Sequence, residues 1–379
     1  MAEAHHHPAI RALPNPRAVA TLPGPAPDRV PLAFHRQLPG YGPTPLVEAP
    51  DLARALGVGQ VWVKDESARL GLPAFKVLGA SWAGYRALQA HLGGAFDPAL
   101  PLDALRARLA PRRPLTLAAA TDGNHGRAVA RLARWLDLDA RIFVPADMVA
   151  ARRAAIAAEG AAVVVVDGSY DEAVARAAGA AGPRCLVLAD TAWPGYEDVP
   201  RWVVEGYATI LWEVDDELAR RGAAGPDLVA IQIGVGALAA AVTRHYRRPG
   251  AACVLASVAA GRPVAVPGPH RSIMAGLNCG QPSPVAWPVV SRGIDLFVAI
   301  GDERAREAMR ALAGAGIVAG ETGAAGLGGL LARRRERGAR ATLAPPGVTP
   351  RTRVLLFNTE GATDPAAYAR VVGRAVRPG

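Results

Sequence analysis

Lys76, in the segment AFKVLGAS, is the side chain whose type and surroundings point most directly to chemistry. Lysine and arginine together number 43, and only Lys64 and Lys76 are lysines. Lys76 begins a predicted helix over 76–92, where the helix dipole disfavours a cation. A primary amine can form an imine or act as a base, which a guanidinium cannot do. We therefore predict that Lys76 is a nucleophile and that Lys64, beside Asp65 and Glu66, forms a structural ion pair.

A glycine-rich turn, IGVGAL (233–238), follows one predicted strand and begins a predicted helix. Glycines let backbone N–H groups approach an anion, and a helix N-terminus adds positive potential. The turn lacks the full GxGxxG pattern and the Lys-Ser/Thr of a nucleotide phosphate loop, so it is either a tight turn or a site for a single phosphate. An imine-forming lysine and a single phosphate together indicate pyridoxal 5'-phosphate (PLP), which carries an aldehyde and one phosphate.

Two carboxylates are further candidates for residues of the active site. Asp122, in ATDGNHG (120–126), would repel a substrate carboxylate and would attract an ammonium or remove a proton, unless it only caps the next helix. Asp190, in DTAW, is either a second site carboxylate or a structural turn residue. His125 is interpreted as structural, and Tyr170 and Tyr196 are weaker pocket candidates.

These residues must be positioned by a chain in which apolar strands alternate with helices, a pattern typical of parallel sheets covered on both faces. Strands are predicted at 61–65, 115–120, 141–145, 162–166, 184–189, 228–233, 253–258, 296–300 and 353–358. Helices are predicted at 76–92, 124–136, 147–158, 170–181, 201–222, 302–314 and 321–337, and from Ala237. The first 45 residues, rich in Pro and Gly, are predicted to form an extended arm. Because ligands in such folds bind beyond the carboxyl ends of strands, the loops before Lys76 and at 121–126, 234–238 and 358–364 should meet.

The composition argues against several classes of function. No apolar run is long enough to span a membrane, and the N-terminus lacks a secretory signal. Three widely spaced cysteines (Cys185, Cys253 and Cys279) indicate a reducing, cytoplasmic location, with a Cys253–Cys279 bridge left open. The net charge of +10 is spread along the chain, and its densest cluster, 333–337, is interpreted as a solvated helix end, so no nucleic-acid partner is expected. The His5–His7 run has no nearby ligands, and no metal site is expected.

Together these motifs resemble the fold type II (tryptophan synthase β) family of PLP enzymes and, within it, the diaminopropionate ammonia-lyase family. The resemblance covers about residues 35 to 375 and is carried by AFKVLGAS, ATDGNHGRAVA, DTAWPGYEDVPRWV, GVGALAAAV, IMAGLNCGQPSPVAWP, AGETGAAGL and NTEGATDP. It implies a two-domain α/β fold of parallel twisted sheets covered by helices. The large PLP-binding domain would comprise 1–88 and 192–379, the small domain 89–191, and the protein would be a homodimer.

The resemblance also implies the contacts of the cofactor. Lys76 would carry PLP, Asn124 would hydrogen-bond its ring 3-oxygen, and Thr359 would face the pyridine nitrogen, with Asn358 and Glu321 as competitors. The phosphate would be held by the backbone of Gly234, Val235, Gly236, Ala237 and Leu238.

The implied reaction is α,β-elimination of D- and L-2,3-diaminopropionate to pyruvate and two ammonia. Lys76 would take the α-proton of one enantiomer and Asp122 that of the other, with Asp190 near the leaving β-amino group. A threonine or serine dehydratase-like eliminase is the nearest alternative, and Asp122 argues against it because those relatives carry small hydroxyl residues in this loop. A nucleic-acid-binding protein and an inactive PLP-binding regulator are more distant alternatives.

Overall fold

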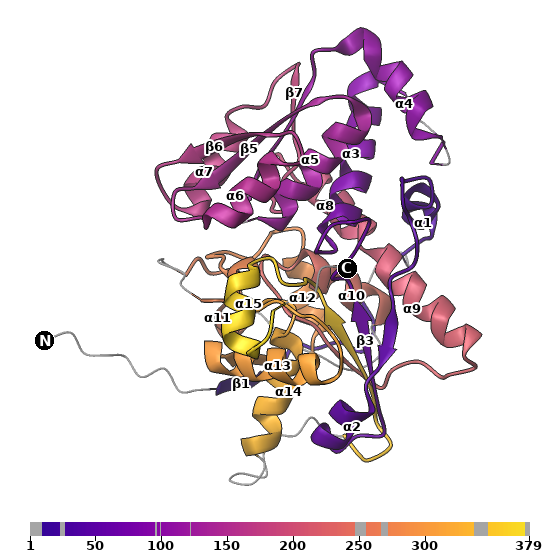
Figure 1. The fold of residues 1–379 in the computed structure, drawn as a ribbon, viewed down its shortest axis with the longest axis vertical. Coiled ribbons are helices and arrows are strands. Elements are labelled where there is room, and N and C mark those ends of the chain that lie inside the picture. Colours follow the sequence, from indigo (N-terminus) through magenta and orange to yellow (C-terminus); the bar gives the residue numbers. More distant parts are fainter. Residues whose placement is uncertain are drawn as a thin grey trace, which may run out of the picture.

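The structure, a computed structural model, describes residues 10–22, 27–94, 97–98, 100–121, 123–246, 255–266, 272–336 and 348–375. Asp122, Cys253 and His5–His7 lie outside these ranges, so what the sequence predicts for them stays a prediction. Within the ranges the strands form two four-stranded sheets and one two-stranded sheet. The first four-stranded sheet lies in the upper half of Figure 1, in purple to magenta, and the later helices lie below it.

The upper sheet has the order β6-β5-β4-β7, and all its strands are parallel. Alternate residues of β4 belong to two different hydrophobic clusters. Leu117 and Ala119 pack in the cluster that contains residues of α5, and Ala118 and Ala120 pack in the one that contains residues of α7. Because successive side chains of a strand point to opposite faces, α5 and α7 cover opposite faces of this sheet. The elements of this half are α3 (Lys76–Leu92), α4 (Leu102–Leu109), η1 (Ala110–Arg112), β4 (Thr116–Ala120), α5 (Asn124–Leu136), β5 (Asp139–Pro145), α6 (Ala150–Ala157), β6 (Ala162–Val166), α7 (Tyr170–Ala178) and β7 (Cys185–Val187).

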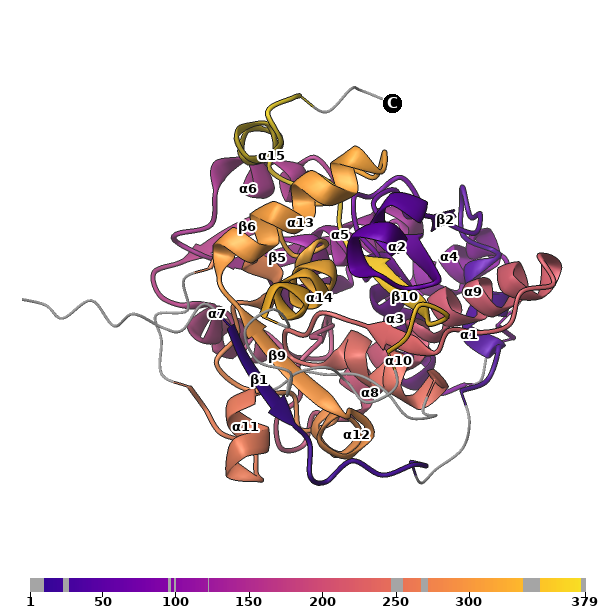
Figure 2. The ribbon, with the colours of Figure 1, turned by 90° about the horizontal axis from the view of Figure 1, so that it is seen from below.

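The lower sheet has the order β2-β3-β10-β8, with β3, β10 and β8 parallel and β2 antiparallel at one edge. Its strands are β2 (Leu46–Glu48), β3 (Gln60–Asp65), β8 (Leu228–Ala230) and β10 (Arg353–Asn358). Around it lie α1 (Val30–His35), α2 (Pro50–Leu56), α8 (Asp198–Gly206), α9 (Ala208–Arg220), α10 (Ala237–Tyr246), α11 (Leu255–Ala260), η2 (Ala275–Leu277), α12 (Trp287–Gly293), α13 (Asp302–Gly314), α14 (Ala325–Glu336) and α15 (Pro365–Val372). Seen from below, β1 (Ile10–Pro14) runs antiparallel beside β9 (Leu296–Ile300) (Figure 2).

Helix α3, which begins at Lys76, packs closely against α8 in the middle of the molecule. A Cβ on Gly79 would lie 2.5 Å from the Tyr207 ring, and one on Gly206 would lie 2.6 Å from the carbonyl oxygen of Leu78. These distances are too short for any side chain, so the glycines are what allow the two helices to approach. The contact fixes the first turns of α3, and with them the position of Lys76.

Several elements differ from the sequence-based predictions. The helix predicted over 201–222 is two helices, α8 and α9, separated at Tyr207, whose ring packs on Phe75 with centroids 4.7 Å apart. The strand predicted at 253–258 is wrong in its described part, because 255–260 form helix α11. The N-terminal arm is more ordered than predicted, since it contains β1 and α1. In the 333–337 cluster, Arg333 is buried, which the prediction of a solvated helix end did not anticipate.

Lys64 lies in a buried cluster of two cations and two carboxylates, all at most 5% exposed. Its Nζ is 2.6 Å from Glu213 and 4.0 Å from Glu66. Arg69 Nη2 bridges the same carboxylates, at 2.6 Å from Glu66 and 2.7 Å from Glu213. The predicted structural ion pair of Lys64 is therefore confirmed, but its nearest partner comes from α9, and Asp65 instead accepts a hydrogen bond from Asn358.

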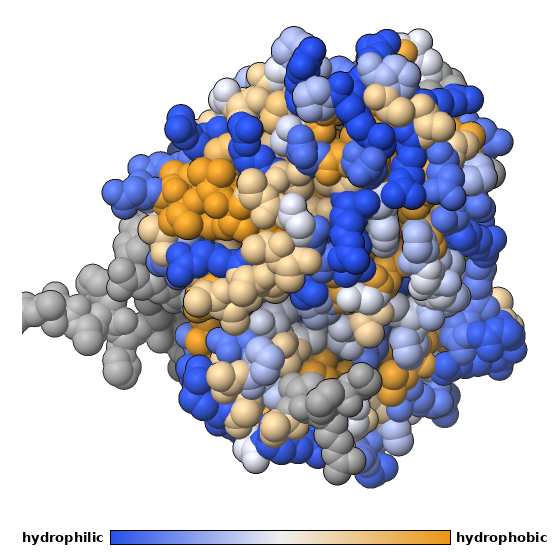
Figure 3. Space-filling view, turned by 45° about the horizontal axis from the view of Figure 1, so that its top comes forward, coloured by the Kyte–Doolittle hydropathy of each residue, from blue (hydrophilic) through white to orange (hydrophobic). Residues whose placement is uncertain are grey.

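The surface in Figure 3 is mostly hydrophilic, with one larger apolar patch toward the upper left of that face. Among the helices that the structure describes, none combines the length and the apolar character needed to cross a bilayer.

Candidate active site

A pocket lies where loops from both four-stranded sheets meet. Each of the four predicted loops contributes to it: Phe75 and Lys76 after β3, Asn124 after β4, 234–238 after β8, and Thr359 and Glu360 after β10. All four loops follow the carboxyl ends of parallel strands, as expected for this architecture. The pocket is completed by Tyr170, Asp190, Gln232, Ile233, Ala239, the 276–279 loop and Thr322.

Lys76 and Asp190 form an ion pair inside this pocket. Lys76 Nζ lies 2.6 Å from Asp190 Oδ2, and the two side chains are 20% and 6% exposed. The pair joins residues 114 apart in the chain, one at the start of α3 and the other after β7. Asp190 is therefore a pocket residue that contacts the predicted nucleophile, and the simple turn role left open for it does not describe its position.

Charge keeps Asp190 ionised in spite of its burial. Burial alone would raise the pKa of this carboxyl, but the positive charge of Lys76 and the hydrogen bond from its amine lower it to about 2. At neutral pH Asp190 is thus a fixed negative charge that stabilises a cation.

His125 is structural, as predicted. Burial lowers its pKa, so the ring is neutral, and its Nε2–H donates to the carbonyl oxygen of Leu188 at 2.7 Å. The ring does not line the pocket. Tyr196 is structural as well: its hydroxyl donates to Val187 O at 2.6 Å and accepts from Ala189 N at 3.0 Å, holding the chain just before Asp190.

Thr359 presents a hydroxyl whose direction is set by a neighbour. Gln232 Nε2 donates to Thr359 Oγ1 at 2.6 Å and to Phe357 O at 3.0 Å. The carbonyl acceptor identifies the Gln232 group as the NH₂, so the Thr359 oxygen is an acceptor in this bond and its own proton is left to donate elsewhere. The competitors lie differently: Asn358 Nδ2 donates to Asp65 and to Val318 O, and Glu321 does not line the pocket.

Asn124 also lines the pocket, and its amide nitrogen donates to Glu360 Oε2 at 2.6 Å. Glu360 and Gln232 were not recognised in the sequence. Glu360 lies in the segment NTEGATDP, and its position directly after Thr359 is the one feature of the sequence that points to a place in the pocket. Gln232, in the turn after β8, carried no signal.

The glycine turn before α10 has the shape of an anion cradle. Gly236 has φ +104°, a left-handed conformation that residues with a side chain rarely adopt. A Cβ added at Gly236 would lie 3.0 Å from the Cβ of Ala286. A Cβ on Gly234 would lie 2.7 Å from Gly276 O. The first turn of a helix leaves its N–H groups without partners in the helix, so α10 offers donors to an anion here. A lysine amine, an anion cradle, an amide and a hydroxyl donor together fit PLP.

Comparison with known proteins identifies the class. Residues 37–344 match the family described as "Pyridoxal-phosphate dependent enzyme". The chain belongs to this family of PLP-dependent enzymes, and its fold is that of fold type II.

The individual proteins to which the chain is similar narrow the comparison further. The chain is 35% identical over 361 residues to the diaminopropionate ammonia-lyase of Escherichia coli K12, covering 89% of each chain. It is 33% identical over 368 residues to that of Salmonella typhimurium LT2, covering 90% of each. The crystal structure of the Escherichia coli diaminopropionate ammonia-lyase with D-serine superimposes with a TM-score of 0.87 at 33% identity, covering 96% of each chain. A match to a threonine dehydratase of Mycobacterium leprae, 31% identical, covers only 38% of this chain.

Proposed function

We propose that the protein is an ammonia-lyase that converts D- and L-2,3-diaminopropionate and water to pyruvate and two molecules of ammonia. The observation that carries this proposal is the Lys76–Asp190 pair, which lines the same pocket as the anion cradle. The diaminopropionate ammonia-lyases that match nearly the whole chain support the choice of substrate.

We propose that the residues of the pocket divide the binding of PLP among them. Lys76 would hold the aldehyde carbon, the N–H groups of 234–238 the phosphate, Asn124 the ring 3-oxygen and Thr359 the pyridine nitrogen. When bound, PLP supplies an electron sink for the α-carbon of the amino acid. The Thr359 hydroxyl is a neutral donor, so it leaves the pyridine nitrogen largely unprotonated and limits this electron withdrawal.

We propose that two bases act on the α-carbon. Lys76 Nζ removes the α-proton of one enantiomer, and Asp122, which lies outside the described residues, removes that of the other. The β-amino group then leaves as ammonia, and water hydrolyses the released enamine to pyruvate and the second ammonia.

Asp190 is proposed to recognise the leaving group. Its low pKa depends on the charge of Lys76, while burial acts in the opposite direction. When the lysine is engaged with the cofactor, a buried carboxylate that has lost this cation favours another cation in its place. The β-ammonium of diaminopropionate is such a cation, whereas the hydroxyl of serine or threonine is not.

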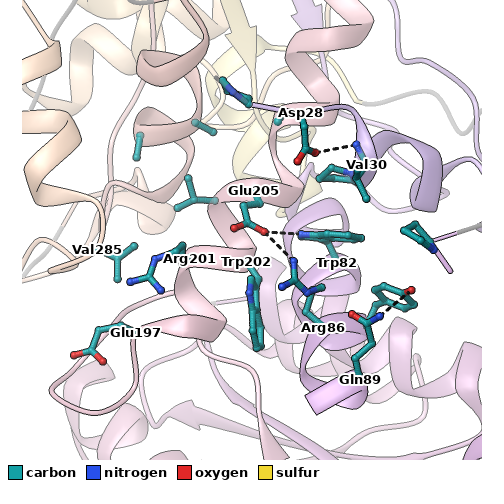
Figure 4. A pocket seen from close by; sticks show the side chains of 18 of the residues that line it. Asp28, Val30, Trp82, Arg86, Gln89, Glu197, Arg201, Trp202, Glu205 and Val285 are labelled. Atoms are coloured by element: carbon teal, nitrogen blue, oxygen red, sulfur yellow. Dashed lines mark hydrogen bonds and ion pairs between the residues drawn. The ribbon is translucent and has the colours of Figure 1, made fainter. Parts of the chain in front are cut away.

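We also propose that the upper sheet, with helices α4 to α7, forms a small domain over 89–191. We further propose that the protein is cytoplasmic and that it is a homodimer. A groove of about 1150 Å³ along α3, α8 and α10 supports the dimer (Figure 4). In it Arg86 lies over the Trp82 and Trp202 rings, 5.5 and 5.1 Å from their centroids, and its guanidinium is 3.5 Å from Glu205.

The composition of this groove suits a second copy of the chain. A symmetric interface joins the same patch on both subunits, so the patch must be complementary to itself. Although the chain is strongly basic, the groove is balanced, with cations at Arg86, Arg201 and Arg244 and anions at Asp28, Glu197 and Glu205. We expect Trp202→Glu to produce monomers in sedimentation velocity and Val165→Glu, at an exposed position of β6, to leave the dimer intact. An unchanged Trp202→Glu dimer would place the interface elsewhere.

The test of the activity is a visible absorption scan of the purified protein followed by a pyruvate assay. We expect a PLP chromophore, pyruvate from both enantiomers of diaminopropionate, and little from serine or threonine. Lys76→Ala should lose the chromophore and the activity. Greater turnover of serine or threonine would instead support the dehydratase alternative. Asp122→Asn should lose one enantiomer selectively, and an equal loss of both would exclude the two-base scheme.

A further inference from the structure

Glu360 is a buried carboxylate of the pocket, 3% exposed, and it is bonded through both of its oxygens. Oε2 accepts the hydrogen bond from Asn124 Nδ2 at 2.6 Å, and Oε1 accepts from the backbone N–H of Thr322 at 3.1 Å. The backbone oxygen of Glu360 accepts from Gly320 N at 2.9 Å. The Thr322 N–H therefore holds the side chain, and the Gly320 N–H holds its backbone, independently of the bond to Asn124.

The backbone around Glu360 is tied to the segment that leads to Lys76. Glu360 forms an antiparallel bridge with Ala74, and the N–H of Gly361 donates to Pro73 O at 2.9 Å. The carboxylate thus has a fixed position relative to the start of α3.

The Asn124–Glu360 bond connects the two sheets. Asn124 follows β4 of the upper sheet, Glu360 follows β10 of the lower sheet, and the residues are 236 apart in the chain. The bond therefore depends on how the two sheets are placed relative to each other.

A carboxylate opposite an amide also decides which way the amide faces. An ionised carboxylate has only acceptors, so it bonds the nitrogen of Asn124 and excludes the reversed orientation. The nitrogen keeps one further N–H. A hydrogen bond to a charged acceptor is stronger than one between neutral groups, so this preference is substantial.

We propose that Glu360 is a positioning residue that acts through Asn124, holding its amide so that an N–H is available to the cofactor. This inference rests on the proposed contact between Asn124 and the PLP 3-oxygen. It predicts that the affinity for PLP depends on the carboxylate of Glu360, although Glu360 itself need not touch the cofactor.

The experiment is a double-mutant cycle read by titration of PLP into the apoprotein. Glu360→Gln keeps the size of the side chain but adds a donor, so the Asn124 amide can reverse. We expect it to weaken PLP binding by roughly 10- to 100-fold, the range for a hydrogen bond to a charged group, and to shift the visible band of the bound cofactor. Combined with Asn124→Ala, it should weaken binding no further than Asn124→Ala alone.

A matched control is Asp65→Asn. Asp65 accepts a hydrogen bond from Asn358 Nδ2 at 2.8 Å, and neither residue of this similar pair lines the pocket. Loss of the Asp65 carboxylate should therefore leave the PLP affinity and the visible band of the cofactor unchanged. If Glu360→Gln does not fold, Glu360→Asp, whose carboxylate is one methylene short, replaces it in the same cycle. Additive losses, or wild-type affinity in the folded Glu360 variant, would overturn the inference. The titration uses no amino-acid substrate, so failure of the proposed reaction would not affect its result.

Discussion

Removal of the Glu213 carboxylate should strongly destabilise the protein, although Glu213 does not line the pocket. Glu213 accepts from Lys64 Nζ at 2.6 Å, from both terminal nitrogens of Arg69 at 2.7 Å and from the Tyr41 hydroxyl at 2.8 Å. Glu213→Gln keeps the shape but leaves two buried cations with one buried carboxylate. Breaking a buried ion pair on one side costs about 3–5 kcal/mol.

The pKa of Glu213 also indicates that the cluster stabilises its carboxylate. Burial alone would raise it, but the hydrogen bonds and charges of Arg69 and Lys64 lower it from 4.5 to about 2. At 1.36 kcal/mol for each tenfold change in proton affinity, this amounts to about 3 kcal/mol. Because the pKa is lowered on folding, this stability is present above pH 4.5 and is lost as the pH falls from 4.5 toward 2.

The assay is urea and thermal denaturation of the holoenzyme at pH 7 and at pH 3. At roughly 2 °C for each kcal/mol, Glu213→Gln should lower the midpoint by about 6–10 °C at pH 7. At pH 3 its difference from the wild type should shrink. Glu217→Gln is the control on the same helix, since Glu217 pairs with the more exposed Arg220 and Arg221 and should cost less than about 1 kcal/mol. Equal stability of Glu213→Gln and wild type at pH 7 would refute the assigned role of the cluster.

Three further changes should affect the site or the helix that carries it. Asp190→Asn should reduce kcat by about 100-fold or more while PLP remains bound; steady-state assays with a visible spectrum check this, and a loss of the chromophore would contradict it. Gln232→Leu frees the Thr359 hydroxyl to reorient, so PLP affinity should fall about tenfold in a titration of the apoprotein. Gly79→Ala forces a methyl group against Tyr207 and should cost about 1–3 kcal/mol in urea denaturation, and an unchanged midpoint would show that the α3–α8 contact can relax.

Helices with clear local signals were predicted well. The predicted boundaries at 76–92 and 124–136 agree with α3 and α5. Both helices end where the next residue is left-handed, Gly93 at φ 71° and Asp137 at φ 55°. Gly, Asn and Asp adopt that conformation most readily, so the stop signals are local and can be read from the sequence.

The failures arise where tertiary contacts decide the outcome. The run 255–260 is apolar except for Ser257, and it is too short for its periodicity to separate a strand from a helix. The helix predicted over 201–222 is interrupted at Tyr207, whose ring packs against Phe75 from a distant part of the chain. That contact leaves no pattern in the residues around Tyr207.

The same distinction applies to the site. Lys76, Asn124 and the 234–238 turn are marked by their own surroundings, and the structure brings them together in one pocket. Glu360 and Gln232 gain their importance from partners 236 and 127 residues away. The sequence could therefore indicate which groups line the pocket, but not which groups orient them.

The near absence of lysine also affects how the protein reacts with aldehydes. Lys64 is 1% exposed, and Lys76, at 20%, lies in the pocket, so apart from an α-amino group the chain offers hardly any accessible primary amine. Proteins with many surface lysines form background adducts when a carbonyl reagent is in excess. Among the side chains, an amine-directed label or a reducible aldehyde should therefore report almost entirely on Lys76, which makes the occupancy of a single side chain measurable in the intact protein once the α-amino group is accounted for.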